Sequence, residues 1–407
     1  MRRTPLALFA VLSAALAGTV ALAGCGGGTP LAGQPLVGVK SDVHQAAQKL
    51  GIPAVATKNT TRIGGGDPIA DAAGVALAVY PSQGPGTHPQ VVTIAPNDDW
   101  QAALAAASME APPLRSPILL STSSSLPSAS ADALGQMAPT GSGPIAGSQI
   151  IRVGNVAAPK GLRSSSIPVG DAATVAASID RFATAARGKA TAAVMVVSAD
   201  QPSYAMPAAG LAAESGDPIL FVDASGVPTA TQQALLAHQH PRIYVIGPAS
   251  AIPPSVLAQL GKYGSVKRVA GTDPASNATT FAAYRDPPCP FRQACAHSSG
   301  SFGWAMRSPG HGYVLVNARR PLDAAASAEL STAGQYGPIL LVDDPGTLPR
   351  PVLDYFLNYA AETYPTSIGP TGAVYNHAWV IGDQNAISVA VQAQVDNLLE
   401  IVPPTPK

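Results

Sequence analysis

The chain repeats one short pattern three times. A proline followed by an apolar run that starts Ile-Leu occurs at Pro117, Pro218 and Pro338. A second proline follows ten or eleven residues later, at Pro127, Pro228 and Pro349. Another apolar run precedes each copy, and a further one follows it and ends at Gly154, Gly247 and Gly382. Because these features recur in one order, we infer three copies of a single supersecondary unit.

The order of elements within each copy is typical of a parallel α/β fold. Short apolar runs alternate with Ala-rich stretches of helical composition, which predicts βαβ units. Residues 194–197 are apolar at every position, as expected for a strand covered on both faces. The first proline then starts a strand, and the second suits the first turn of a helix, where its missing N–H costs nothing. We expect three tandem Rossmann-like modules with parallel sheets.

The repeat also divides the chain. We place the three modules at residues 59–158, 159–265 and 266–403. The third is longer because residues 285–311 add a loop, and such additions to a repeated scaffold often carry specialised contacts.

The N-terminus has the features of an export signal. Arg2 and Arg3 precede an apolar stretch, and residues 1–24 end in Leu-Ala-Gly before Cys25. This ending resembles the bacterial lipobox, which implies lipidation of Cys25 and a lipid anchor in the outer face of the cytoplasmic membrane. The alternative is an ordinary secretory signal that is followed by a cysteine by chance. Residues 25–58, Gly-rich at their start, are expected to be the lipidated cysteine and a tether.

The other two cysteines are consistent with export. Cys289 and Cys295 lie six residues apart in a Pro-rich loop, so in an oxidising compartment we expect them to form a local disulfide. A metal site that also uses His297 is the alternative, but no fourth ligand has suitable spacing. We therefore expect no metal.

Charge excludes one class of partner. Charged residues make up 12% of the chain and hydrophobic residues 46%, which is enough apolar material for packed cores. The formal net charge is zero. A nucleic-acid binder normally carries a basic excess, so we expect no nucleic-acid partner.

The module openings suggest a family. Residues 267–273 (Lys-Arg-Val-Ala-Gly-Thr-Asp) resemble the opening of the cell wall-binding repeat type 2 family of Gram-positive bacteria, residues 61–67 nearly so, and residues 167–171 only weakly. The Asp323-Ala324-Ala325 run is similar to the family's Asp-Ala-Leu helix, and Gln101 and Tyr204 occupy the equivalent places. The resemblance, which extends over residues 60–402, implies three modules around a pseudo-threefold axis that hold an anionic cell-wall polymer. With the lipid anchor expected at Cys25 and no further domain expected for effector activity, the chain would depart from the usual pattern of this family.

Candidate binding residues follow from the fold. In open parallel α/β sheets, ligands lie beyond the carboxyl ends of the strands. Polar residues there, or in the module openings, are Arg62, Asp67, Asp99, Asp200, Arg268, Asp273, Arg319 and Asp323. Each carboxylate has the alternative role of capping a helix, and Arg62 and Arg268 that of pairing with the acid five residues on. His238 and His240 end a helix, where we expect solvated side chains rather than a metal pair.

Sequence motifs of catalysis are missing. The chain contains no P-loop, G-x-S-x-G, S-x-x-K or H-E-x-x-H pattern, so we expect neither an enzyme nor a cofactor. The leading hypothesis is a lipid-anchored envelope protein that binds a cell-wall polysaccharide, another envelope polymer or an envelope partner. The alternatives are a solute-binding lipoprotein of a transport system and a hydrolase with an unrecognised site.

Overall fold

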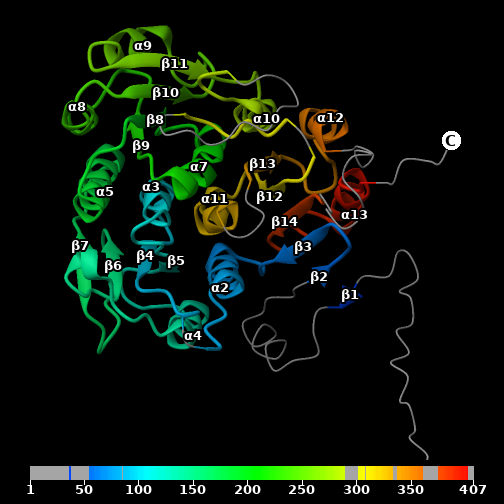
Figure 1. Cartoon of the computed structure of the whole chain (residues 1–407), viewed down its shortest axis with the longest axis horizontal. Coiled ribbons are helices and arrows are strands. Elements are labelled where there is room, and N and C mark those ends of the chain that lie inside the picture. The colour runs from blue at the N-terminus through cyan, green and yellow to red at the C-terminus, as the bar shows by residue number, and fades with distance from the viewer. Residues whose placement is uncertain are drawn as a thin grey trace, which may run out of the picture. The chain divides into compact units, whose positions relative to one another are not determined.

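The computed structural model describes residues 36–37, 55–84, 86–288, 301–307, 309–332, 337–360 and 375–401 (Figure 1). Contacts divide the chain into Met1–Gln34 and Pro35–Lys407, and every described residue belongs to the second unit. The expected signal peptide, lipidated Cys25 and Cys289–Cys295 disulfide all lie outside the described residues.

Each copy of the repeat alternates strands with helices. The first copy contains β3 (Thr60–Ile63), α2 (Pro68–Val79), β4 (Val92–Pro96), α3 (Trp100–Ala106), η1 (Ala107–Met109), β5 (Ile118–Ser121), α4 (Ser128–Met137), η2 (Gly143–Ile145) and β6 (Ile150–Val153). The second contains β7 (Ser164–Ile167), α5 (Ala172–Arg187), β8 (Ala193–Ser198), α6 (Pro202–Ala205), α7 (Pro207–Ser215), β9 (Ile219–Val222), α8 (Thr229–Ala237), β10 (Arg242–Ile246) and α9 (Pro254–Leu260). The third contains β11 (Ser265–Val269), α10 (Pro274–Ala283), β12 (Gly312–Asn317), α11 (Pro321–Ser327), η3 (Ala328–Ser331), β13 (Ile339–Val342), α12 (Arg350–Tyr359), β14 (His377–Ile381) and α13 (Val389–Leu398). Two short strands, β1 (Leu36–Val37) and β2 (Val55–Ala56), precede the first copy.

Three sheets form, and each takes one strand from another copy. Their strand orders are β5-β4-β6-β7, β9-β8-β10-β11 and β13-β12-β14-β3-β2-β1. Pairing is parallel throughout, except that β2 is antiparallel to both β1 and β3. The opening strand of the second copy thus completes the first sheet, that of the third completes the second, and β3 completes the third. The predicted α/β class with three parallel sheets is confirmed, and the strand exchange gives it a cyclic, threefold pattern.

Strand pairing crosses the module limits drawn from the repeat. Strand β7 begins just after the limit at residue 159 and pairs with β6 of the preceding module. Strand β11 spans the limit at residue 266 and pairs with β10. The module limits therefore describe repeats of the sequence, whereas each sheet contains strands from two neighbouring modules.

Helices with small side chains fill the centre. We call α3, α7 and α11 the inner helices; α11 contacts α3 and α7, while α7 contacts η1 and η3 (Figure 1). Gly210 in α7 lies so close to η3 that a Cβ at this position would be 2.6 Å from the Ser331 hydroxyl. The Ala-rich composition is therefore explained by close packing between helices of different copies.

The repeated prolines and glycines mark the element ends. Strands β5, β9 and β13 begin one residue after the first proline of each copy. The second prolines are the N-cap residues of α4, α8 and α12, one position before the predicted first turn. The glycines that follow β6, β10 and β14 all have positive φ, which explains why these turns need a residue without a Cβ.

Candidate functional site

Arg62 and Arg268 connect neighbouring copies. Arg62 is buried; its Nη1 donates to the carbonyls of Gly382 (2.7 Å) and Asp383 (2.9 Å), and its Nη2 to that of Ile387 (2.7 Å). Arg268 donates in the same way to the carbonyls of Gly247 and Ile252. In both cases the acceptors belong to the end of the last strand of another copy and the turn after it. These contacts give both arginines a structural role.

Three of the candidate carboxylates cap helices. Asp67 accepts hydrogen bonds from the first turn of α2, Asp99 from that of α3 and Asp273 from that of α10. Asp273 also forms a reciprocal capping box with Ser276. Capping therefore takes the place of the ion pairs considered for Asp67 with Arg62 and for Asp273 with Arg268.

A hollow of about 450 Å³ lies where the carboxyl ends of β4 and β12 meet the start of α2. We call it the Trp100 hollow; it is lined by Gly66, Asp67, Pro68, Asn97, Asp98, Trp100, Arg319, Arg320, Pro321 and Leu322. Of the candidates from sequence, it brings together Asp67 and Arg319. The other six are not part of its lining, and Asp200 is an exposed residue beyond β8.

Side chains of complementary chemistry surround the Trp100 hollow. The guanidinium of Arg319 and the carboxylates of Asp67 and Asp98 belong to exposed residues. Trp100 is half-buried and its ring packs edge-on against Phe221, with centroids 5.7 Å apart. An aromatic side chain among a few charged groups suits a polar ligand with apolar patches, and the guanidinium suits an anionic one.

Trp100 is the residue that sequence reasoning missed. The signal was available, because Trp100 is one of only three tryptophans in the chain and directly follows Asn97, Asp98 and Asp99 at a strand end.

Arg320, which lines the hollow, contacts two buried acidic side chains, Asp71 and Asp323. The Arg320 Nη2 is 2.7 Å from Asp71 Oδ2, and its Nε is 2.6 Å from Asp323 Oδ2. Both carboxylates are fully buried, and burial together with the charge of Asp323 raises the pKa of Asp71 to about 9. Burial raises the pKa of Asp323 to about 6, against the opposing charge of Arg320. Asp323 is thus a support for Arg320 inside the fold and does not reach solvent.

The corresponding positions of the other copies make neutral contacts. The Tyr204 hydroxyl donates to the Thr272 carbonyl (3.3 Å), and the Gln101 side chain donates to the Ala199 carbonyl (3.1 Å). Tyr204 and Gln101 each contact a neighbouring copy, as Arg320 does. Unlike Arg320, they do so with an uncharged side chain.

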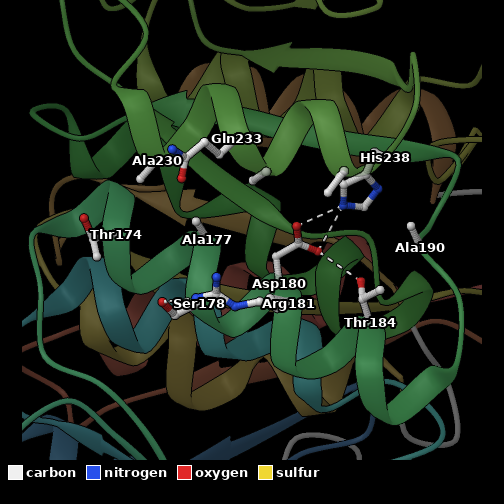
Figure 2. A pocket seen from close by; sticks show the side chains of 12 residues that line it. Thr174, Ala177, Ser178, Asp180, Arg181, Thr184, Ala190, Ala230, Gln233 and His238 are labelled. Carbon is white, nitrogen blue, oxygen red and sulfur yellow. Dashed lines mark hydrogen bonds and ion pairs between the residues drawn. The ribbon is translucent and has the colours of Figure 1, made fainter.

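A second pocket of about 220 Å³ lies between α5 and α8 and contains His238 (Figure 2). The prediction of a solvated His238 side chain is wrong, because its imidazole is 1% exposed. Its Nδ1 is 2.8 Å from the Thr191 carbonyl and its Nε2 is 2.9 Å from Asp180 Oδ2. Burial on its own would lower the pKa of His238, but the hydrogen bond and charge of Asp180 raise it overall.

The His238 contact predicts a pH-dependent contribution to stability. With a folded pKa above the unfolded value of about 6.5, protonated His238 stabilises the fold fully below that value, and the contribution is lost as pH rises through the folded pKa. We expect His238→Gln to lower the free energy of unfolding by about 2 kcal/mol at pH 6 and by less at pH 9. Urea denaturation at both pH values measures this, with His240→Gln, an exposed neighbour, as the control. Equal losses at the two pH values would contradict the assignment.

The described part of the chain holds no group of three His, Cys, Asp and Glu side chains placed to bind a metal ion. Among its helices, none combines the length and hydrophobicity that crossing a bilayer requires.

Comparison with known proteins identifies one family model. The model "Cell wall binding domain 2 (CWB2)" matches residues 171–257, which lie within the second copy. The match agrees with the resemblance read from sequence and supports cell-wall binding as the general function of this segment. Among curated proteins, none matches the chain.

Several solved chains match this fold, and Cwp8 and Cwp6 are two of them. Cwp8 from Clostridium difficile has a TM-score of 0.63 and 16% sequence identity, covering 88% of this chain and 54% of that chain. Cwp6 from Clostridium difficile has a TM-score of 0.63 and 14% identity, covering 85% of this chain and 49% of that chain. The chain therefore spans about half the length of each of these structures.

Proposed function

We propose that this chain is a non-catalytic envelope protein that binds an anionic cell-wall polymer, with the Trp100 hollow as its principal contact. The observation that carries the proposal is the match of residues 171–257 to a cell wall-binding domain. The hollow lies at the carboxyl ends of parallel strands, the usual ligand position in folds of this class.

In this proposal the side chains of the hollow contact different parts of the polymer. Trp100 offers an apolar surface to one face of a sugar ring, and Arg319 pairs with an anionic group of the polymer. The backbone N–H of Arg319 donates to the Asn317 side chain (2.9 Å), which holds this turn in place. Asp67 and Asp98 accept hydrogen bonds from sugar hydroxyls. Exposed Asp200 at the end of β8 is a further contact along the polymer, and several weak contacts to one repeating ligand add up to firm binding.

The proposal includes attachment to the membrane. Lipidation of Cys25 would hold the protein at the outer face of the cytoplasmic membrane, within reach of the wall. A disulfide between Cys289 and Cys295 would form a short ring within the added loop of the third copy.

Substitutions in the Trp100 hollow test the proposal. We expect Arg319→Ala to weaken binding to purified cell-wall polysaccharide about tenfold, because one charge-assisted hydrogen bond contributes about 1.5 kcal/mol. Sedimentation of the full chain with wall polysaccharide measures the change. Arg350→Ala is the matched control, since Arg350 is an exposed arginine on α12 outside the hollow.

Two results would contradict the proposal. One is unchanged polysaccharide binding by a folded Arg319→Ala, Trp100→Ala double variant. The other is tight, saturable binding of one small solute with no affinity for the wall, which is the property of a solute-binding lipoprotein.

A further inference from the structure

The strands that open the three copies have equivalent places in their sheets but different neighbours. Each of β3, β7 and β11 pairs on one side with the last strand of another copy. On its other side, β3 is covered by the antiparallel strand β2. Among the described residues, β7 and β11 are instead the last strands of their sheets (Figure 1). An edge of this kind can pair with a further strand.

The hydrogen bonds of β7 show which of its backbone groups face outward. N–H groups of β6 and of the residue after it donate to the carbonyls of Arg163 (3.1 Å) and Ile167 (3.0 Å). Because a parallel pair uses alternate residues of a strand, Ser165 also faces β6. The N–H and C=O groups of Ser164 and Ser166 therefore point away from the sheet, and both serines are exposed.

The first copy shows how an equivalent edge is filled. Thr60 lies seven residues before the N-cap of α2, as Ser164 does before the N-cap of α5. The carbonyl of Thr60 accepts a hydrogen bond from the Thr57 N–H (2.8 Å), at the end of the antiparallel strand β2. The corresponding groups of β7 thus have the position and direction to pair with an antiparallel strand.

The two open edges differ in charge. If two molecules paired through β11 about its central residue, Lys267 would lie opposite the same lysine, and like charges in that position are destabilising. Strand β7 is Ser-Ser-Ser-Ile and carries neither the charge nor the internal proline that usually protects an edge. Of the two open edges in the described part of the chain, β7 is therefore the one suited to self-pairing.

Strand β7 is complementary to itself. When a second β7 runs antiparallel with Ser165 opposite Ser165, each Ser164 lies opposite Ser166 of the other molecule. Both members of such a pair direct their N–H and C=O outward, so the two pairs exchange four hydrogen bonds. Pro168 is the next residue with outward groups, and because it has no N–H the pairing ends there. The arrangement is a closed twofold contact, the commonest kind in homo-oligomers.

We propose that this protein forms a twofold dimer in which the β7 strands of two molecules pair antiparallel about Ser165 and join the two first sheets into one. The contact is separate from the Trp100 hollow, so it can be tested independently of polymer binding.

Cysteine cross-linking of the full chain tests the register. Opposite residues of a non-hydrogen-bonded antiparallel pair have Cα atoms about 4.5 Å apart, which is within the range that a disulfide spans. We expect Ser165→Cys to give a covalent dimer on a non-reducing gel after mild oxidation. Ser164→Cys is the matched control, because its counterpart lies diagonally at about 7–8 Å, and it should link at least fivefold less. The wild type measures linking through the native cysteines.

Sedimentation equilibrium measures the affinity. We expect the wild-type mass to rise to twice that of the monomer with increasing concentration. Ser166→Pro should raise the dissociation constant at least tenfold, because it removes two of the four hydrogen bonds. The fold does not use this N–H, and an edge strand tolerates proline at such a position. Ser166→Thr, which keeps the N–H, should dimerise as the wild type does.

A second variant covers misfolding of the first. If Ser166→Pro does not fold, Ser166→Lys should also raise the dissociation constant at least tenfold, because it places two ammonium groups on the same face of the joined sheet. The proposal is overturned if the wild type stays monomeric at every concentration, if a folded Ser166→Pro or Ser166→Lys dimerises like the wild type, or if Ser165→Cys links no better than Ser164→Cys.

Discussion

Replacing Arg62 with methionine should lower the free energy of unfolding by about 3–5 kcal/mol. Methionine keeps the apolar stem of the buried side chain but leaves the carbonyls of Gly382, Asp383 and Ile387 without their donors. It also removes the bond from Nε to the Gln392 side chain (2.9 Å). These acceptors follow β14 in the third copy. The substitution therefore weakens the contact between the first copy and the third.

Urea denaturation with a matched variant checks the Arg62 result. Arg268→Met removes the equivalent contacts to Gly247 and Ile252, but Arg268 is half-buried and has fewer acceptors. Its loss should be about half as large. A decrease in the free energy of unfolding below about 1 kcal/mol for Arg62→Met would contradict this prediction. It would mean that water satisfies the carbonyls in place of the arginine, which is inconsistent with a buried contact between copies.

Asp71→Asn should make the stability of the protein much less dependent on pH. The pKa of Asp71 is raised to about 9 in the fold by burial and by Asp323, against about 4 when unfolded. Its contribution is therefore complete below pH 4 and is lost as pH rises through 9, with a slope of up to about 1.4 kcal/mol per pH unit. The variant removes that slope and should be more stable than the wild type at pH 9.

The third copy shows that asparagine fits this position. Asn277 Oδ1 accepts a hydrogen bond from the Gly271 N–H (3.2 Å), just as Asp71 accepts one from Gly65. Thermal and urea denaturation from pH 5 to pH 9 measure the slope, and Asp67→Asn, at an exposed N-cap that asparagine also satisfies, is the control. A slope equal to that of the wild type would mean that Asp71 is ionised throughout and fully compensated by Arg320.

The fold was predictable because each copy carries its own local signals. Pro117, Pro218 and Pro338 restrict the backbone at strand starts, and the apolar runs after them specify strands buried on both faces. The exchange of strands was not predictable in this way. Nothing local to β7 or β11 shows that it pairs with the preceding copy, because parallel pairing is determined by packing of the whole sheet.

The candidate site was only partly predictable, for a related reason. Asp67 and Arg319 are 252 positions apart in the sequence and meet because β3 joins the third sheet beside β14, next to β12. Arg62 resembled a ligand-binding residue because a guanidinium that binds carbonyls looks the same in sequence as one that binds a phosphate.

The cyclic exchange of opening strands fixes the number of copies. Head-to-tail contacts of one kind close into a ring only at the number their rotation allows, and otherwise leave both ends open. A gene that lost or gained one copy would leave β3 without β14 in register beside it, and an unpaired strand edge is prone to aggregation. New specificities in such a protein are therefore expected to arise by changes in loops and junctions, with the count of three held constant.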